Sequence, residues 1–213
     1  MKQSRELESE VPASGTGQRG PASHERREQI LHAADDHFRL YGYRKTTVSD
    51  LGRAIGVSSA YIYRFFESKQ AIGEAICTMV LGKIQVELNA IVADDIAATE
   101  KMRRIYKCLV AKGLELFFKE RRLHDIVTSS IEEKWESGHN YKKALLAIVT
   151  KVVIAGRETG EFERKTPLDE TCRAIAQTLV AFAHPILLEQ VEPEELEANS
   201  VAVANLVLRS LSP

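Results

Sequence analysis

Hydroxyl side chains between residues 46 and 59 are the groups of this 213-residue chain whose types and spacing point to a definite chemistry, which is phosphate binding. Thr46, Thr47, Ser58 and Ser59 stand where two short helices are predicted to begin. The first turn of a helix carries unpaired N–H groups and the positive end of the helix dipole, and both attract anions. We therefore expect these four hydroxyls to contact the phosphate backbone of a nucleic acid.

Basic residues accompany the hydroxyls, although the whole chain has a net charge of only −1. Residues 24–69 carry eight Lys and Arg against six Asp and Glu, whereas residues 70–213 carry 18 against 21. Because basic residues attract nucleic acid, the asymmetry assigns the contact to the N-terminal part. A solvated helical face would carry the same modest excess, and that alternative stays open.

Two short helices must position these side chains, and the spacing predicts them over residues 47–55 and 58–65. Gly56 falls between them, where a tight bend needs a backbone that adopts positive φ at low cost. Gly52 lies where the two helices would cross, so a side chain larger than that of Gly or Ala would hold them apart. The positions expected to face inward are all apolar: Val48, Leu51, Ile55, Val57, Ile62 and Phe65.

Capping residues support the same two helices. Thr46 or Thr47 is expected to cap the first helix, with Asp50 in its first turn, and Ser58 is expected to cap the second. An ordinary helical hairpin, whose caps serve stability alone, is the alternative. The joint match of two glycines with the inward apolar positions favours a helix-turn-helix.

Residues 23–83 also resemble the DNA-binding domain of the tetracycline-repressor (TetR) family of bacterial regulators. The matching residues are Ile30, Leu31, Ala34, Phe38, Gly42, Tyr43, Thr46, Thr47, Val48, Gly56, Val57, Ser58, Ile62, Tyr63, Phe66, Ser68 and Lys69. The sequence departs from the family at Glu67, where Pro or a basic residue is frequent, and at residues 59–61, which replace a frequent Lys-Gly-Thr. The family's base preference therefore does not carry over.

The resemblance implies an all-α homodimer of about nine helices per chain. A three-helix helix-turn-helix domain would precede a helical region that binds a small-molecule effector, and the chain would be a transcriptional regulator. Repression is the expected direction of control, with the effector releasing the protein from a palindromic operator. DNA contacts are then expected at Thr46, Thr47, Ser58, Ser59, Ala60, Tyr61, Tyr63, Arg64 and Lys69. Residues 59–61 would read the bases, while Tyr63 and Lys69 would hold phosphates.

Composition divides the chain into three parts. Residues 1–22 are rich in Ser, Gly and alternating charge and are expected to form a flexible arm. Residues 23–83 form the expected DNA-binding domain, and residues 84–213 the expected effector-binding and dimerisation domain. Arg19 could bring the arm to a DNA groove, but three acidic residues near its start favour a solvated tail.

Helical periodicity continues through the rest of the chain. We predict helices over residues 70–92, 98–119, 123–135, 141–157, 168–189 and 193–211. Pro185 should break the fifth of these near residues 181–184. The last two carry more apolar residues than one buried face needs, so residues 168–211 are expected to form a homodimer interface. A monomer that buries both helices in its own core is the alternative.

The effector site is implied by the resemblance rather than by a motif. Its candidate residues are Tyr106, Phe117, Trp135, His139, Tyr141 and Phe182, from a wider group that includes Phe118 and His124. Such side chains could line an apolar cavity with few polar anchors, but aromatic residues at helical spacing are also common in plain cores. No compound and no cofactor is indicated.

Other classes of function find little support. The sequence has no HExxH, no Gly-rich phosphate loop and no nucleophile elbow, so an enzyme is not expected. The three cysteines are far apart and lack ligand spacing, so we expect core residues and no metal site. No apolar run is expected to span a bilayer, which favours the cytoplasm. A helical adaptor that binds protein instead of DNA is the remaining alternative.

Overall fold

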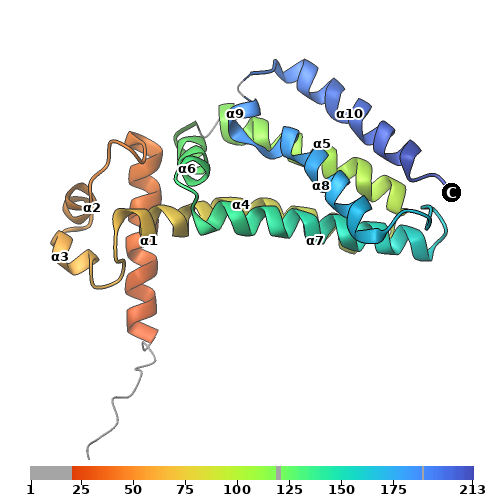
Figure 1. Ribbon diagram of the computed structural model, residues 1–213. Helices are drawn as coiled ribbons and strands as arrows, with labels where there is room; N and C mark the ends of the chain where they lie inside the picture. Colours follow the sequence, from red (N-terminus) through yellow and green to blue (C-terminus); the bar gives the residue numbers. More distant parts are fainter. Residues whose placement is uncertain (1–20, 119–120, 189) are drawn as a thin grey trace, which may run out of the picture.

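Ten helices make up the part of the chain that the computed structural model describes, which is residues 21–118, 121–188 and 190–213. No strand occurs among these residues, as the helical periodicity predicts. Figure 1 shows a small head, formed by α1, α2 and α3, from which α4 runs into a longer body. The predicted arm of residues 1–22 is too long at its end, because residues 21 and 22 begin α1. Its other residues, 1–20, with their predicted flexibility and groove contact, lie outside the described residues.

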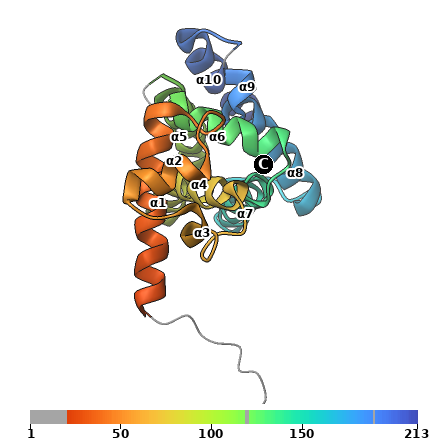
Figure 2. The same ribbon diagram turned by 90° about the vertical axis from the view of Figure 1, so that its left-hand side faces the viewer.

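The head combines one long helix with two short ones. They are α1 (Pro21–Tyr41), α2 (Val48–Ile55) and α3 (Ser59–Ile62). The expected apolar face of α1 is confirmed, since Ile30, Leu31, Ala34 and Phe38 are all buried. Val48, Leu51 and Ile62 join them, so the three helices share one core. Figure 2 shows these helices in front of the body when the head faces the viewer.

The body consists of seven helices. They are α4 (Lys69–Ala93), α5 (Ala98–Phe118), α6 (Arg121–Glu132), α7 (Glu136–Glu158), α8 (Leu168–Ala183), α9 (Pro185–Leu188) and α10 (Pro193–Ser210). Helix α7 lies beside α4 along much of its length, α5 packs against both of them, and α8 packs against α7 and α5 (Figure 1). Helix α10 packs mainly against α5 and closes the far side of the body.

The observed helices differ from the predicted ones in two informative places. A tenth helix appears because His184 is extended and Pro185 starts a new turn, which confirms the predicted break. The predicted helix over residues 123–135 ends earlier, at Glu132, because Lys134 adopts a left-handed φ of 56°. Trp135 therefore caps α7 instead of ending α6.

Helix α4 corrects the expectation that no segment could cross a membrane. Among the described residues it is the one helix that is long and apolar enough to do so by length and composition. A central core helix meets the same criterion, and α4 packs against α1, α5, α6 and α7. This packing buries part of the apolar surface of α4, including Ile72, Ile76 and Leu88, whereas Val86 is 70% exposed.

Candidate nucleic-acid interface and effector cavity

The turn between α2 and α3 has the geometry that the sequence predicts. Thr47 caps α2: its hydroxyl accepts from the N–H of Asp50 at 3.2 Å, and the Asp50 carboxylate accepts from the N–H of Thr47 at 2.9 Å. The Thr47 hydroxyl also donates to this carboxylate at 2.6 Å, and that bond, followed by the one from the Thr47 N–H, lowers the pKa of Asp50. Gly56 ends α2 with a φ of 70°, and Ser58 caps α3 by accepting from the N–H of Tyr61 at 3.1 Å. The bend between α2 and α3 is therefore stabilised by two N-caps and by a left-handed glycine.

Thr46 contradicts its predicted role as a phosphate contact. It is only 1% exposed, and its hydroxyl donates to the carbonyl oxygen of Gly42 at 2.8 Å. The hydroxyl oxygen of Thr46 also lies 3.2 Å from Nδ1 of His37 on α1. Because these neighbours occupy the hydroxyl and shield it from solvent, Thr46 ties the start of the turn to α1 and does not face DNA.

The remaining predicted contacts lie together on the outer side of the head. Ser58, Ala60 and Arg64 are exposed, as is Thr47, and Tyr63 is 52% exposed. Ser59 and Tyr61 are half-buried. The Tyr61 ring packs against Phe65 at 5.3 Å between ring centroids, and the Arg64 guanidinium lies 5.7 Å from the Tyr61 ring. Part of Tyr61 therefore supports the segment instead of being free to touch a base.

Lys69, at the start of α4, lies beside the head. Its Nζ atom stands 4.3 Å from the centroid of the Tyr43 ring and 3.5 Å from the carbonyl oxygen of Arg44. Burial lowers the pKa of this ammonium group, an effect that Glu133 opposes. Lys69 is half-buried, so its stem is held in place while its end can still reach a phosphate.

Trp135 lies at the junction between head and body and not in the expected effector cavity. It is 2% exposed, and its ring meets Tyr43 edge to face with 5.3 Å between centroids. Its Nε1–H donates to the Glu133 carboxylate at 2.9 Å. Nearby, Arg44 forms an ion pair with Glu132 at the end of α6. The turn between α6 and α7 thus packs directly on the head.

Two of the predicted effector residues meet in the interior of the body. Tyr141 and Phe182 line a hollow of about 20 Å³ together with His124, which belongs to the wider predicted group. A second hollow of about 40 Å³ shares Tyr141 and is otherwise lined by residues from α4, α6, α7 and the end of α8. Tyr106 contacts this region through Phe182, with 5.8 Å between ring centroids, and shares a hydrogen bond with Thr178.

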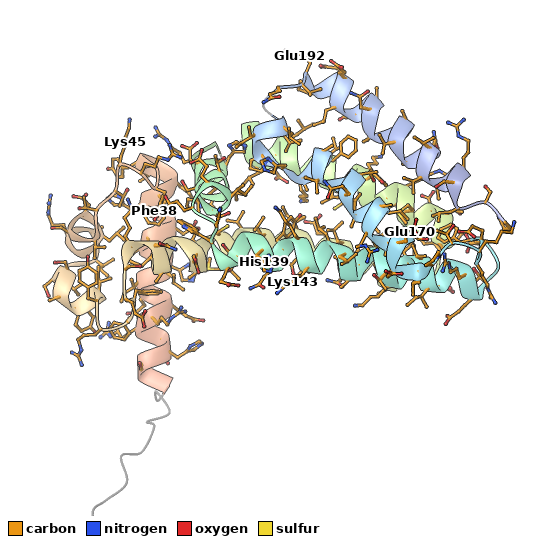
Figure 3. The ribbon with its side chains drawn as sticks, in the orientation of Figure 1. Phe38, Lys45, His139, Lys143, Glu170 and Glu192 are labelled. Carbon is orange, nitrogen blue, oxygen red and sulfur yellow. The ribbon has the colours of Figure 1, made fainter. Side chains whose placement is uncertain are left out.

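The structure does not place two other predicted effector residues, His139 and Phe117, at these hollows. His139 is exposed on α7, so it lines neither hollow (Figure 3). The side chain of Phe117 lies outside the described residues. Sequence reasoning missed Ser130 of α6 and Lys142 of α7, which line the second hollow together with His184. The sequence leaves His184 open between the dimer interface, the pocket and a structural role, and the structure places it between α8 and α9 on the wall of this hollow.

Burial sets the protonation of the polar groups at the hollows. It raises the pKa of Tyr141, so the phenol stays protonated and acts as a neutral hydrogen-bond donor. Burial, followed by the positive charge of Lys142, lowers the pKa of His184. The two hollows therefore present a mostly apolar wall with one phenol, two imidazoles, one aliphatic hydroxyl and one ammonium group.

The outer face of α10 carries uncovered apolar side chains. Val201 is 60% exposed and Leu206 is 63% exposed, on a stripe that also holds Ala198 and Ala202. Val203, in contrast, is half-buried and packs on the core. The described cysteines are free: Cys77 and Cys172 are buried and Cys108 is half-buried, and no metal-binding cluster occurs among the described residues.

Two family descriptions match the sequence. Residues 30–76 match the family described as "Bacterial regulatory proteins, tetR family". Residues 98–204, half of the chain, match "Tetracyclin repressor-like, C-terminal domain". The first match spans the turn between α2 and α3, and the second spans most of the body.

Curated relatives match over shorter stretches. The nucleoid occlusion factor SlmA of Vibrio campbellii is 27% identical over 120 residues, which cover 50% of this chain and 61% of that protein. The uncharacterized HTH-type transcriptional regulator YhgD of Bacillus subtilis is 24% identical over 114 residues, or 54% of this chain and 56% of that protein. The chain thus spans less than two thirds of the length of these relatives.

Solved structures share the fold over most of their length. A transcriptional regulator from Cytophaga hutchinsonii aligns with a TM-score of 0.69 at 22% identity, covering 88% of this chain and 99% of that one. The regulator FadR from Bacillus subtilis, in complex with stearoyl-CoA, aligns with a TM-score of 0.61 at 21% identity, covering 86% and 98%. At these identities the likeness concerns the fold alone.

Proposed function

Because the chain belongs to the TetR family of bacterial regulators, we propose that it is a DNA-binding transcriptional regulator. Repression is the proposed direction of control, with a small-molecule effector releasing the protein from a palindromic operator. The observation that carries this proposal is the capped turn, in which Thr47, Gly56 and Ser58 present the segment of residues 58–64 on the outside of the head. A helix presented in this way fits the major groove of duplex DNA.

The proposed interface has two kinds of contact. Thr47, Ser58, Tyr63 and Lys69 bind phosphates and set the position of the head on the duplex. The exposed parts of residues 59–61, with Arg64, meet the base edges. In a homodimer the two heads would enter major grooves about 34 to 36 Å apart, one helical turn of DNA. Thr46 is left out because it is buried.

The proposed domains meet inside a helix. We assign DNA binding to residues 23–83, extended to residue 21 where α1 begins, effector binding with dimerisation to residues 84–213, and an arm to residues 1–20. Helix α4 continues across residue 83 without a break. A continuous helix transmits a displacement from the body to the head, which supports control of DNA binding from the body.

The effector is proposed to bind at the two hollows around Tyr141. Their volumes, about 20 and about 40 Å³, are far below the roughly 300 to 1,000 Å³ of a typical small-molecule pocket. The walls must therefore move apart when a ligand enters. We expect this movement at the end of α8, because His184, at the break before Pro185, lines the second hollow. An apolar compound with one hydrogen-bonding or anionic end suits this lining.

A cytoplasmic homodimer completes the proposal, with the exposed faces of α8 and α10 as its interface. An adaptor that binds only protein is the other candidate, and DNA titration separates the two. The regulator should bind duplex DNA with an affinity that falls steeply with salt concentration, because each phosphate contact releases counterions. Binding that is absent at low salt would refute the proposal. Mapping the bound sites in a genome would then give the operator and narrow the effector class.

A further inference from the structure

Three side chains from three segments form a stack between the head and the body. Lys69 stands over one face of Tyr43 at 4.3 Å, and Trp135 meets Tyr43 edge to face at 5.3 Å. Lys69 begins α4, Tyr43 follows α1, and Trp135 belongs to the turn between α6 and α7. The stack therefore joins a predicted phosphate contact to the body of the protein.

Close packing leaves the two rings little freedom. A Cβ atom on Gly73 of α4 would lie 2.7 Å from both the Trp135 and the Tyr43 ring, so both rings rest against the helix backbone. Phe38 meets Tyr43 edge to face at 5.4 Å. The backbone N–H of Trp135 donates to the carbonyl oxygen of Ser130 at 2.8 Å, and its indole N–H donates to Glu133. Trp135 is thus fixed from both of its ends.

A lysine side chain needs this support if it is to bind a phosphate well. Its four-carbon stem has many rotamers, and ordering them when DNA binds lowers the affinity. A cation–π interaction holds the ammonium group over the face of an aromatic ring, and this interaction is stronger where the ammonium group is partly desolvated. Tyr43 can give this support only while its own ring is held, and Trp135 covers one edge of that ring.

We infer that Trp135 is a positioning residue for DNA binding, because it fixes the Tyr43 ring and thereby holds the Lys69 ammonium ready for a phosphate of the DNA backbone. The inference rests on the proposed function, since it concerns the same DNA interface. It also assigns a role to the turn between α6 and α7: Ser130, whose carbonyl holds Trp135, lines the hollow of about 40 Å³. A change at that wall would therefore reach Lys69 through three contacts, which join Ser130 to Trp135, Trp135 to Tyr43 and Tyr43 to Lys69.

Variants at both ends of the stack test the inference. Trp135→Leu removes the aromatic edge, Lys69→Ala removes the phosphate contact, and Trp135→Phe keeps a ring beside Tyr43. Phe162→Leu is the matched control, because Phe162 is an equally buried aromatic residue that packs on Gly156 at the far end of the body. Each variant is titrated against a labelled 25-base-pair duplex, about two helical turns, at stepped NaCl concentrations, with its helical content checked by circular dichroism.

We expect Trp135→Leu and Lys69→Ala each to weaken DNA binding about tenfold. Each should also lower the slope of log affinity against log salt by about one, which corresponds to one lost phosphate contact. The double variant should lose no more than either single one, while Trp135→Phe and Phe162→Leu keep the wild-type slope. A merely structural role for Trp135 would not change the slope, and it would make the two losses additive.

The chain has a single Trp, so its emission supplies a second readout that needs no variant at position 135. Saturating DNA should change the emission of the wild type and change that of Lys69→Ala much less. If the wild type fails to bind duplex DNA, the proposed function itself fails. If the wild type binds with a clear salt slope, either additive losses or an emission that DNA leaves unchanged would overturn the inference.

Discussion

A Cβ atom on Gly52 would lie 2.6 Å from the carbonyl oxygen of Val57. Helix α2 therefore touches the segment before α3 backbone to backbone, and the angle between the two helices depends on the missing side chain. The sequence predicts a crossing at this glycine but would admit Ala there. The structure excludes even a methyl group, because the nearest atom belongs to the backbone and cannot rotate away.

Gly52→Ala should lower the free energy of unfolding by about 1 to 3 kcal/mol, since the two segments must move apart. Gly82→Ala is the matched control, because Gly82 lies in α4 and a Cβ atom there would meet nothing within 4 Å apart from its chain neighbours and the backbone of its own helix. This control should stabilise the protein by about 0.5 to 1 kcal/mol through helix propensity. Denaturant unfolding followed by circular dichroism measures both, and equal effects of the two changes would contradict the prediction.

Tyr61→Phe should change base preference while leaving the fold intact. The ring packs on Phe65 and beside Arg64, so Tyr61→Ala would disturb the segment, whereas Phe keeps the ring and removes the hydroxyl. We expect a loss of about 1 kcal/mol at one or two base pairs, measured on a randomised duplex library. Tyr63→Phe, at a proposed phosphate contact, should weaken all sequences alike. An unchanged ranking for Tyr61→Phe would remove the hydroxyl from base reading.

His184 should make stability depend on pH. Burial, followed by the charge of Lys142, lowers the pKa of His184 below its ordinary value of 6.5, so the unfolded chain takes up a proton at a higher pH than the folded one. Stability contributed by the neutral imidazole is thus fully present above pH 6.5 and falls as the pH drops toward the folded pKa.

His184→Gln should make the free energy of unfolding less dependent on pH below pH 6.5. Lys142→Gln should have part of this effect, because it removes the positive charge that repels a protonated His184. Denaturant unfolding between about pH 7.5 and about pH 5.5 measures the effect. If the free energy of unfolding of the wild type rises as the pH falls, or if both variants keep the wild-type dependence, the assignment to His184 is wrong.

The sequence predicts the head well because the caps and the turn that shape it depend on residues close together in the chain. The caps at Thr47 and Ser58 act on N–H groups three residues away, and Gly56 needs only its own φ. Thr46 was predicted wrongly for the opposite reason. Its hydroxyl meets His37, nine residues earlier on α1, and residue type alone does not reveal that contact.

The body shows the same limit on a larger scale. The sequence predicts the break before Pro185 from one residue, whereas the Trp135 ring packs on Tyr43 and Gly73, which are more than 60 residues away. Aromatic type alone assigned Trp135 to the effector site, although the fold places it against Tyr43. Cavity residues such as Ser130 and His184 meet only through packing, so no spacing in the sequence indicates them.

Leu206→Asp tests the proposed homodimer. Leu206 is 63% exposed on α10, so a charge there leaves the monomer's core intact but would be buried without a partner in a dimer interface. Val203 is a poorer site, because its half-buried side chain packs on the core and a charge would disturb the fold. We expect Leu206→Asp to be helical and monomeric in sedimentation velocity at micromolar concentration.

Val86→Asp is the matched control for this change. Val86 is 70% exposed on α4, outside the proposed interface, so a charge there should leave the dimer unchanged. The monomeric Leu206→Asp protein should lose most of its affinity for a palindromic site, because a single head engages only one half-site. On a duplex that carries one half-site alone, the variant and the wild type should bind with similar affinity, because only one head contacts the DNA in either case. A wild type that sediments as a monomer, or a monomeric variant that binds the full palindrome as tightly as the wild type, would defeat the proposal.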